Sequence, residues 1–365
     1  MVTVLCIFPR FYIGGVSKAL SFVANTCDNA GMDVHCISCS SEPETILLNK
    51  NIHRYTVDLK EKSTGFNKIL NRFSFMLKLR SKIRRIKPDV IIVFLPDLTK
   101  AVVYDTIGLS IPIIGSERGN PLLHSNKLLD KYRWVFNKCA AVVFQTQAAR
   151  DVYGLETINS IIPNPAISRN TQQKERRVRS GNNIITVSRL SEEKNIVGLI
   201  RAFGLASSHI PSSKLIIYGY GPQQVELEEL VATLGLNERV CFAGNVKDFT
   251  EQDDNSSIFV LNTLSEGMPN ALIEAMIAGY SCICTDCPIG APKWLSDNGR
   301  RVKLVPVKDD VALSKAIIEV SNNKEIAKSL SENSKEIIEL LNPERIGKQW
   351  LDLINFVVNG CDGNN

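Results

Sequence analysis

Two patterns of hydrophobic and polar positions alternate along this chain. Short apolar runs rich in β-branched residues are followed by longer stretches with helical spacing, as in residues 2–8, 16–30 and 34–39, with Gly31 as a stop signal. This alternation is typical of βαβ units built on a parallel sheet. Further strands are predicted at residues 90–95, 111–114 and 141–144. Together these elements predict one doubly wound domain.

The alternation stops at residues 164–183, whose polar and charged composition is typical of a linker. It restarts with predicted strands at residues 184–187, 215–218, 240–242, 258–261 and 282–284. We therefore expect an α/β fold of two doubly wound Rossmann-like domains, residues 1–165 and 166–345. A final helix within residues 346–365 can pack on either domain. Ligands of such sheets bind beyond the carboxyl ends of the strands, so we expect the two domains to face each other across a cleft.

Composition supports a folded enzyme-sized protein. The chain has 365 residues, of which 44% are hydrophobic and 22% charged, and these values exclude disordered, collagenous and fibrous classes. The longest apolar run, residues 90–95, is far shorter than the roughly 18 residues of a membrane-spanning helix. The N-terminus lacks the basic region and cleavage site of a secretory signal, so we expect a cytoplasmic chain.

Cysteine and acidic clusters give little indication of a metal. The ten cysteines lie mostly inside apolar runs, which is typical of reduced core residues. The acidic pairs at residues 253–254 and 309–310 are interpreted as solvated loop acids. A zinc site shared by two distant CxxC pairs stays open as the weaker alternative. These pairs are Cys36 with Cys39, and Cys284 with Cys287.

Glycines follow two of the predicted strands. Gly15 comes after the first strand and opens a helix, where glycine lets the backbone approach an anion and the helix N-terminus presents N–H groups. Gly219 and Gly221 follow the strand at residues 215–218. These glycines are also compatible with tight turns that bind no ligand.

Two cations follow the first strand of the second domain. Arg189 and Lys194 lie between that strand and the next helix, a setting in which both can bind a diphosphate. The alternative is a solvated loop in which Glu192 and Glu193 balance the two cations.

Two carboxylates follow the strand at residues 258–261. Glu266 lies in the loop and Glu274 lies one or two turns into the following helix. The predicted helix N-terminus, residues 268–272, offers N–H groups to phosphate or sugar oxygens. The alternative is a loop acid and a surface helix residue.

Glu266 and Glu274, with seven residues between them in SEGMPNALIEAMIAG, resemble the EX7E motif of retaining glycosyltransferase family 4. That family has the two-domain GT-B fold. Other segments agree in order and spacing: GGVSKAL (14–20), IIPNP (161–165), VSRLSEEKN (187–195), YGYGP (218–222) and CFAGNVKD (241–248). GSERGNP (115–121) and CTDCPIGAP (284–292) resemble the branch that builds bacterial O-antigen and capsule.

The resemblance implies a role for each matching residue. Arg189 and Lys194 would bind the donor diphosphate with a backbone amide near Gly15, Glu266 would lie beside the donor sugar, and Glu274 would hold the ribose. Backbone around Gly219 and Gly221 would approach the donor. Further donor contacts would come from Met268, Pro269, Asn270, Ala271 and Leu272, and base contacts from Gly244, Asn245 and Val246.

The chain departs from the family at one position. Many members have a His in the first domain that contacts the donor sugar, whereas this chain has Glu117 and Arg118 there, with His124 further on. The resemblance implies Glu117 or Arg118 as the substitute. The alternative is that Arg118 only pairs locally with Glu117.

A basic segment in the first domain suggests where the acceptor binds. Residues 67–88 contain eight basic residues, no acidic one and several large apolar side chains. The surrounding residues 1–165 carry 21 basic and 13 acidic residues. Such a helix is typical of a segment that binds an anionic membrane surface, where a polyprenyl-diphosphate acceptor would lie. An ordinary amphipathic helix and a nucleic-acid patch are the alternatives.

The resemblance therefore implies a retaining, metal-independent glycosyltransferase on the inner face of the cytoplasmic membrane, with no cofactor. It would transfer a hexose or N-acetylhexosamine from a UDP-sugar to a lipid-linked oligosaccharide. Glu266 is interpreted as a sugar-positioning group rather than a nucleophile. A UDP-sugar 2-epimerase of similar fold and a non-catalytic nucleotide-binding protein are the alternatives, and a nucleic-acid partner is not expected.

Overall fold

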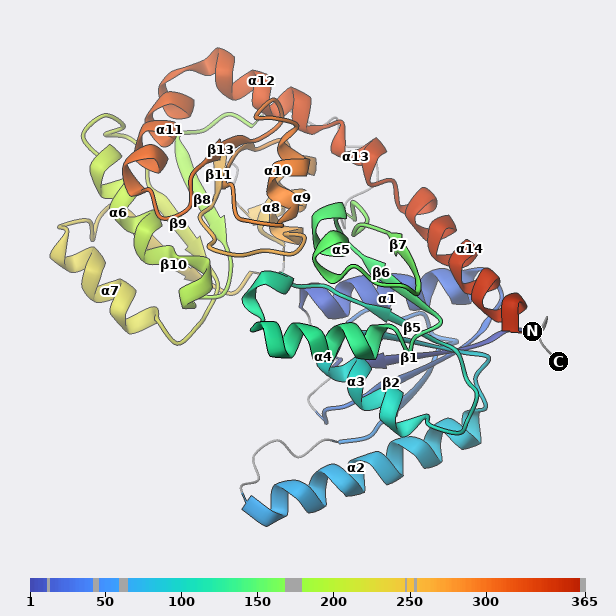
Figure 1. The fold of residues 1–365 in the computed structure, drawn as a ribbon. Helices are drawn as coiled ribbons and strands as arrows, with labels where there is room; N and C mark the ends of the chain where they lie inside the picture. Colours follow the sequence, from blue (N-terminus) through green and yellow to red (C-terminus); the bar gives the residue numbers. More distant parts are fainter. Residues whose placement is uncertain are drawn as a thin grey trace. The chain divides into compact units, whose positions relative to one another are not determined.

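The computed structural model describes residues 1–11, 14–41, 46–58, 65–167, 179–246, 248–252 and 255–361. The chain forms two compact units (Figure 1). The first consists of Met1–Pro165 and Pro343–Asn365, and the second of Ala166–Asn342. The acidic pair at residues 253–254 and linker residues 168–178 lie outside the described residues.

The first unit contains a seven-stranded parallel sheet in the order β3-β2-β1-β4-β5-β6-β7. Its strands are β1 (Thr3–Phe8), β2 (Asp33–Ser38), β3 (His53–Thr56), β4 (Val90–Phe94), β5 (Ile113–Ser116), β6 (Ala141–Phe144) and β7 (Ile158–Ile161). Its helices are α1 (Gly15–Asn29), α2 (Gly65–Ile86), α3 (Pro96–Asp105), η1 (Pro121–Leu123), α4 (Asn126–Phe136), α5 (Gln147–Tyr153) and α14 (Pro343–Cys361).

The hydrophobic pattern predicted the central strands of this sheet but missed β3 and β7. Both are edge strands, and no residue of either is fully buried. A strand that buries so little side-chain surface needs no apolar run, so its sequence carries no strand signal.

The last helix, α14, belongs to the first unit although it ends the chain. Trp350 and Ile354 of α14 lie in the same hydrophobic core as Val4, Leu20 and Phe94. The ring centroids of Trp350 and Phe94 are 5.7 Å apart. Buried apolar contact therefore holds α14 against α1 and the sheet.

The second unit contains a six-stranded parallel sheet in the order β10-β9-β8-β11-β12-β13. Its strands are β8 (Asn183–Val187), β9 (Leu215–Tyr218), β10 (Val240–Gly244), β11 (Ser256–Leu261), β12 (Ser281–Thr285) and β13 (Lys303–Val305). Its helices are η2 (Glu192–Lys194), α6 (Ile196–Ala206), α7 (Gln224–Thr233), α8 (Phe249–Gln252), α9 (Asn270–Ile277), α10 (Ala291–Ser296), α11 (Asp310–Asn322), α12 (Lys324–Ser334) and α13 (Ile337–Leu340).

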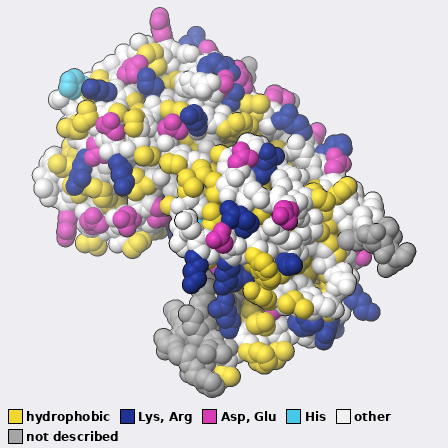
Figure 2. Space-filling view, in the orientation of Figure 1, with side chains coloured by type: hydrophobic (Ala, Val, Ile, Leu, Met, Phe, Trp, Pro, Cys, Tyr) yellow, Lys and Arg dark blue, Asp and Glu magenta, His cyan; other side chains and the backbone are white. Residues whose placement is uncertain are grey.

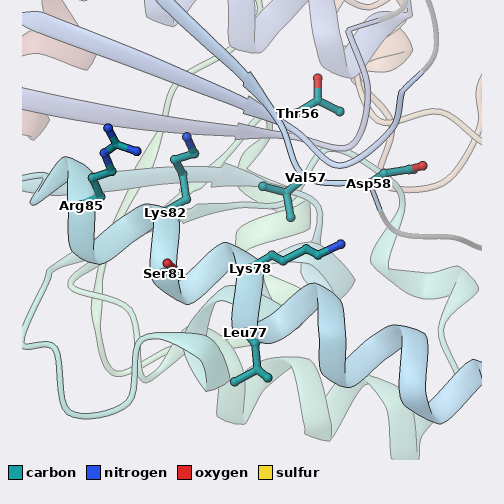
Figure 3. Close-up of a pocket in the computed structure, with 8 residues that line it drawn as sticks. All are labelled: Thr56, Val57, Asp58, Leu77, Lys78, Ser81, Lys82 and Arg85. Carbon is teal, nitrogen blue, oxygen red and sulfur yellow. The ribbon is translucent and has the colours of Figure 1, made fainter.

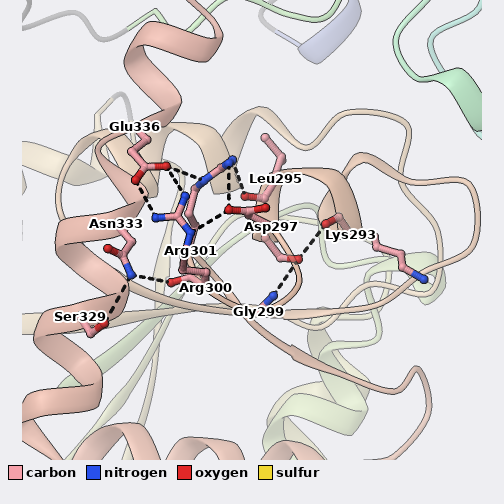
Figure 4. Close-up of polar contacts among 10 residues, drawn as sticks. Lys293, Leu295, Asp297, Gly299, Arg300, Arg301, Ser329, Asn333 and Glu336 are labelled. Carbon is pink, nitrogen blue, oxygen red and sulfur yellow. Dashed lines mark hydrogen bonds and ion pairs between the residues drawn. The ribbon is translucent and has the colours of Figure 1, made fainter.

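A polar network joins α10 to α13 in this unit (Figure 4). The Glu336 carboxylate accepts hydrogen bonds from Arg300 Nη1 at 2.6 Å and from Arg301 Nε at 3.2 Å. Asp297 pairs with Arg300 at 2.7 Å. The second acidic pair has a local role as well, since the Asp309 carboxylate accepts from the amide of Ala312 and caps α11.

Candidate active site

The loops after β8 and β11 meet at the carboxyl edge of the second sheet. β8 and β11 are neighbours, and hydrogen bonds continue their contact into the loops. The backbone carbonyl of Glu193 accepts from the Leu264 amide at 2.8 Å, and the Asn195 carbonyl accepts from the Asn262 side-chain amide at 2.9 Å. The Thr263 hydroxyl also donates to Glu193 O at 3.0 Å. These bonds fix the relative positions of the two loops that carry the predicted cations and Glu266.

The loop contact brings Lys194 and Glu266 together. Lys194 Nζ lies 2.5 Å from Glu266 Oε1, and the two side chains are only 17% and 13% exposed. A charge-assisted hydrogen bond of this length is strong when water is largely excluded. An ammonium has three N–H donors, so Lys194 can hold Glu266 and still donate to a phosphate.

Arg189 has a different setting from Lys194. Its side chain is 75% exposed and its Nη2 lies 2.6 Å from Glu193 Oε1. Burial raises the pKa of Glu193, but hydrogen bonds from its own backbone amide and from Ser191, with the charges of Arg189 and Lys194, bring the pKa below its usual value. Glu193 thus balances the charge of Arg189, as in the alternative stated from the sequence, whereas Lys194 pairs with Glu266.

The helix after Glu266 begins two residues later than the pattern predicted. α9 starts at Asn270, because the first intrahelical bond runs from the Ile273 amide to the Pro269 carbonyl at 3.2 Å. Met268 and Pro269 are buried and precede the helix. The amides of residues 270–272 therefore form its N-terminal turn, and Glu274 lies one turn further on and half-buried.

Gly219 and Gly221 pack two loops of the protein together. A Cβ on Gly219, whose φ is +137°, would lie 1.8 Å from the Ser188 carbonyl oxygen, and one on Gly221 would lie 2.1 Å from that of Leu190. The Leu190 amide also donates to the Tyr220 carbonyl at 3.0 Å. Close packing of the loops after β8 and β9 thus accounts for both glycines, and their contact with a ligand stays a prediction.

The predicted base-contacting turn follows β10. Gly244 has φ +69°, and a Cβ there would lie 2.9 Å from the Tyr220 hydroxyl. Its carbonyl accepts from the Gly219 amide at 2.8 Å, which links this turn to the neighbouring loop. Asn245 and Val246 follow, exposed and half-buried. In the first unit, Gly15 is the first residue of α1 and is exposed.

Glu117 is buried and bonded within the protein, and its contact with the donor sugar stays a prediction. It is 2% exposed, and its Oε1 accepts from the amides of Arg118 at 2.9 Å and Gly119 at 2.8 Å. Its Oε2 accepts from the Tyr153 hydroxyl at 2.5 Å, and His124 Nε2 lies 3.9 Å away. These partners make Glu117 an anchor for the turn after β5.

Arg118 packs on aromatic rings rather than on Glu117. Its guanidinium carbon lies 3.9 Å from the Phe94 ring centroid and 5.6 Å from that of Trp350. Nη1 donates to Asn164 Oδ1 at 3.2 Å, while Nε has no hydrogen-bond partner among the described residues. Burial lowers the pKa of Arg118 to about 9, although Glu117 opposes the shift. The local ion pair considered from the sequence does not form.

The basic helix α2 has two apolar faces. One row is buried: Phe75, Leu79 and Ile83. The other row is exposed at 50%, 60% and 54%: Leu70, Phe73 and Leu77. An exposed apolar row with spacing i, i+3, i+7 is one stripe of a helix, so α2 presents large hydrophobic side chains beside its cations.

Exposed aromatic residues continue this surface over α3 and α4, where Figure 2 shows hydrophobic side chains beside Lys and Arg. Tyr104 and Trp134 stack with ring centroids 6.0 Å apart, and Lys138 Nζ lies 5.7 Å from the Trp134 ring. No helix among the described residues is long and apolar enough to span a membrane.

A cavity of ≈ 610 Å³ lies between α2 and the segment after β3 (Figure 3). Lys78 extends from α2 on the side of Asp58, while Lys82 and Arg85 lie further along the helix and point toward the strands (Figure 3). Thr56, Val57, Leu77 and Ser81 complete the lining of the cavity. Three cations of α2 thus line this cavity on the predicted acceptor surface.

The CxxC cysteines are core residues. Nine of the ten cysteines have described side chains; all nine are free thiols, and Cys241 is the exposed one. Burial raises the pKa of Cys39 to about 12, and burial, with a smaller contribution from Glu266, raises that of Cys287 to about 11. Such thiols stay protonated at neutral pH, which is unfavourable for metal binding.

Comparison with known families identifies both units. Residues 13–165 match the Glycosyltransferase Family 4 model, and residues 168–337 match the Glycosyl transferases group 1 model. The chain therefore belongs to the glycosyltransferases, with the Family 4 model over its first unit and the group 1 model over its second.

Similar proteins include a Campylobacter jejuni enzyme named GalNAc-α-(1→4)-GalNAc-α-(1→3)-diNAcBac-PP-undecaprenol α-1,4-N-acetyl-D-galactosaminyltransferase. It is 25% identical over 98% of this chain and 100% of its own length. A lipopolysaccharide core biosynthesis glycosyltransferase of Rhizobium meliloti is 25% identical over 82% of this chain and 85% of its own.

Solved structures share the fold at low identity. TarM has a TM-score of 0.81 at 15% identity, covering 97% of this chain and 99% of its own. Anabaena HepE in complex with UDP and glucose has a TM-score of 0.75 at 16% identity, covering 97% and 100%. The predicted GT-B fold, with two parallel-sheet α/β units, is confirmed.

Proposed function

We propose that this glycosyltransferase transfers a hexose or N-acetylhexosamine from a UDP-sugar to a polyprenyl-diphosphate-linked oligosaccharide, with retention at the anomeric carbon. Membership of the family supports glycosyl transfer. The name of the C. jejuni relative includes a PP-undecaprenol acceptor, and HepE was solved with UDP and with UDP-glucose. The R. meliloti relative is a lipopolysaccharide core biosynthesis glycosyltransferase by name, which supports bacterial surface-polysaccharide synthesis as the setting.

The observation that carries the donor side is the Lys194–Glu266 pair beside the N-terminal turn of α9. Transfer breaks the bond between the anomeric carbon and the β-phosphate oxygen, so negative charge develops on the diphosphate. Lys194, Arg189 and the α9 amides can stabilise that charge without a metal ion. Glu266 holds Lys194 in place and lies where the sugar would bind.

Retention follows if the acceptor hydroxyl attacks on the face from which the diphosphate leaves. Its oxygen bonds to the anomeric carbon, and its proton passes to the departing phosphate oxygen. Glu274, one helical turn into α9, is assigned to the ribose hydroxyls. This mechanism uses Glu266 for positioning and forms no covalent intermediate on it.

The acceptor side is assigned to α2. Its exposed Leu70, Phe73 and Leu77 favour contact with lipid, and its exposed cations favour an anionic surface. Lys78, Lys82 and Arg85 line one cavity, and cations at its wall favour an anionic ligand such as a diphosphate group. We therefore place the working enzyme on the cytoplasmic face of the membrane.

The test incubates the purified protein with UDP- and GDP-sugars, with and without a polyprenyl-diphosphate oligosaccharide. The proposal predicts acceptor-dependent UDP release, a product heavier by one sugar with retained configuration, and the same rate in EDTA. UDP release together with a 2-epimerised sugar and no glycosylated product would identify an epimerase. Nucleotide binding with no turnover on any pair would contradict the proposal.

A further inference from the structure

Three metal-ligating side chains meet on one face at the edge of the first sheet. β2 and β3 pair in parallel with His35 opposite His53. Asp33 lies two residues before His35 on the same strand, and alternate residues of a strand share a face. The topology therefore brings Asp33, His35 and His53 together although 18 residues separate the two histidines in the sequence.

The ligand atoms of this cluster have separations that suit one metal ion. Asp33 Oδ2 lies 3.1 Å from His35 Nε2, and Asp33 Oδ1 lies 3.6 Å from His53 Nε2. One ligand atom from each residue lies within 4.8 Å of the others. Bonds of about 2.0–2.1 Å in a tetrahedral zinc site place neighbouring ligand atoms ~3.3 Å apart. Each histidine Nε2 lies near that distance from one Asp33 oxygen, His35 from Oδ2 and His53 from Oδ1.

A second residue orients His35 for this role. His35 Nδ1 lies 3.3 Å from the Tyr55 hydroxyl, two residues along β3 from His53. Without a metal, Nε2–H can donate to Asp33 Oδ2 at 3.1 Å; with a metal on Nε2, the proton lies on Nδ1 and can be donated to Tyr55. Histidines that bind metals usually have such a partner on the other ring nitrogen. His35 is 12% exposed and His53 is 56% exposed, so the cluster is anchored on one side and open on the other.

We propose that Asp33, His35 and His53 bind one Zn²⁺ ion, with water in the fourth position. Two imidazoles and one carboxylate favour zinc over magnesium or calcium, which prefer oxygen ligands only. The cluster lies at the amino end of the strands, whereas the ligand-binding loops of such sheets follow the carboxyl ends. The site is therefore structural and goes beyond the proposed transfer.

Zinc at this position would cross-link the sheet edge. β3 is a four-residue edge strand without a fully buried side chain, so little apolar contact holds it on β2. A metal that binds His53 and two β2 residues only in the folded state stabilises that pairing.

The test measures zinc binding by calorimetry and Co²⁺ binding by visible absorption, on the full chain in a Cys241→Ser background, which removes the exposed thiol among the nine described cysteine side chains. The proposal predicts one equivalent of Zn²⁺, a Co²⁺ spectrum of tetrahedral intensity without a thiolate band, and a rise in melting temperature of about 2 °C or more.

Variants separate this site from adventitious binding. His53→Ala and His35→Gln should each weaken zinc binding at least about tenfold, and Tyr55→Phe by about tenfold through loss of the His35 partner. His209→Ala, which removes an exposed histidine in the second unit, should leave binding unchanged. Absence of a Zn²⁺ equivalent in the parent, or equal affinity in parent and His53→Ala, would overturn the proposal. A melting temperature equal to that of the zinc-free parent would show that these variants are folded.

Discussion

Lys194 Nζ and Glu266 Oε1 lie 2.5 Å apart although the two residues are 72 positions apart in the chain. The pair exists because the backbone and side chains of residues 262–264 bond to the carbonyls of Glu193 and Asn195. Each partner compensates the other's charge in a place where both are more than four-fifths buried. The pair therefore presents a fixed ammonium to the edge of the sheet before any donor binds.

Replacing Lys194 by Ala should lower kcat/KM by about 100-fold or more, because it removes a preorganised cation from the leaving diphosphate. The measurement is steady-state kinetics with the donor identified by the assay above. Lys214→Ala, at an exposed lysine before β9, is the matched control and should retain the parent rate. Parent-like kinetics in Lys194→Ala would exclude the assigned role.

A double-mutant cycle separates catalysis from folding at this pair. Lys194→Ala leaves the Glu266 carboxylate without its partner, so the single variant should also melt lower. Adding Glu266→Gln should restore part of the lost stability but none of the lost activity, because the amide carries no charge to compensate. Recovery of activity in the double variant would show that Lys194 serves only to neutralise Glu266.

Gly219→Ala should destabilise the second unit by about 3 kcal/mol or more, since a Cβ would lie 1.8 Å from Ser188 O at a φ of +137°. Gly235→Ala is the control: its φ of +65° is also positive, but no atom lies within 4 Å of the added Cβ. That change should cost about 1 kcal/mol. Chemical denaturation measures both, and equal costs would refute the close packing of the two loops.

Contact with the membrane should depend on both the exposed cations and the exposed apolar row of α2. Arg72, Lys78, Arg84 and Arg85, all exposed, are replaced together by Gln, and Phe73 and Leu77 by Ser in a second variant. Each should reduce binding to anionic vesicles, with up to about 1 kcal/mol lost per cation. Arg80 is left unchanged, because its guanidinium donates to the backbone carbonyls of Asp105 and Ile107 and so supports the fold.

The control for vesicle binding is a Gln replacement of Lys214, Lys293, Lys308 and Lys324, which removes four exposed cations from the second unit. This variant has the same net charge as the α2 variant. If both charge variants bind anionic vesicles as the parent does, α2 is not the membrane surface.

Asp105 should make stability depend on pH. It is 2% exposed, and within the described part of the chain neither carboxylate oxygen has a hydrogen-bond partner. Burial raises its pKa from 3.8 to about 7, although the charge of Arg80 opposes the shift. The folded state thus binds a proton more tightly than the unfolded state. The contribution of protonated Asp105 to the free energy of unfolding is therefore present below about pH 4 and is lost as pH rises to about 7.

Asp105→Asn removes that titration. The variant should be more stable than the parent by ~1 kcal/mol at pH 8, and the difference should shrink or reverse at pH 5. Thermal unfolding at the two pH values measures it. A stability difference that does not change with pH would show that Asp105 does not titrate in this range.

The sequence by itself determined the two α/β units and placed most candidate residues at strand ends. Buried parallel strands require apolar runs, whereas the helices between them require apolar residues at helical spacing. The local hydrophobic pattern therefore predicts the central strands. The same pattern placed Arg189, Lys194 and Glu266 in loops that follow the carboxyl ends of strands. In a parallel sheet these loops lie at one edge.

Only the tertiary structure decided which of these groups touch. Lys194 pairs with Glu266 rather than with its neighbours Glu192 and Glu193, and Glu117 is buried by amides and by Tyr153, 36 residues away. The cluster of Asp33, His35 and His53 depends on β3, which has no apolar run. The local sequence pattern indicates how much side-chain surface a helix or strand buries. These contacts instead join loops and sheet edges from distant parts of the chain, and the local pattern carries no information on those distances.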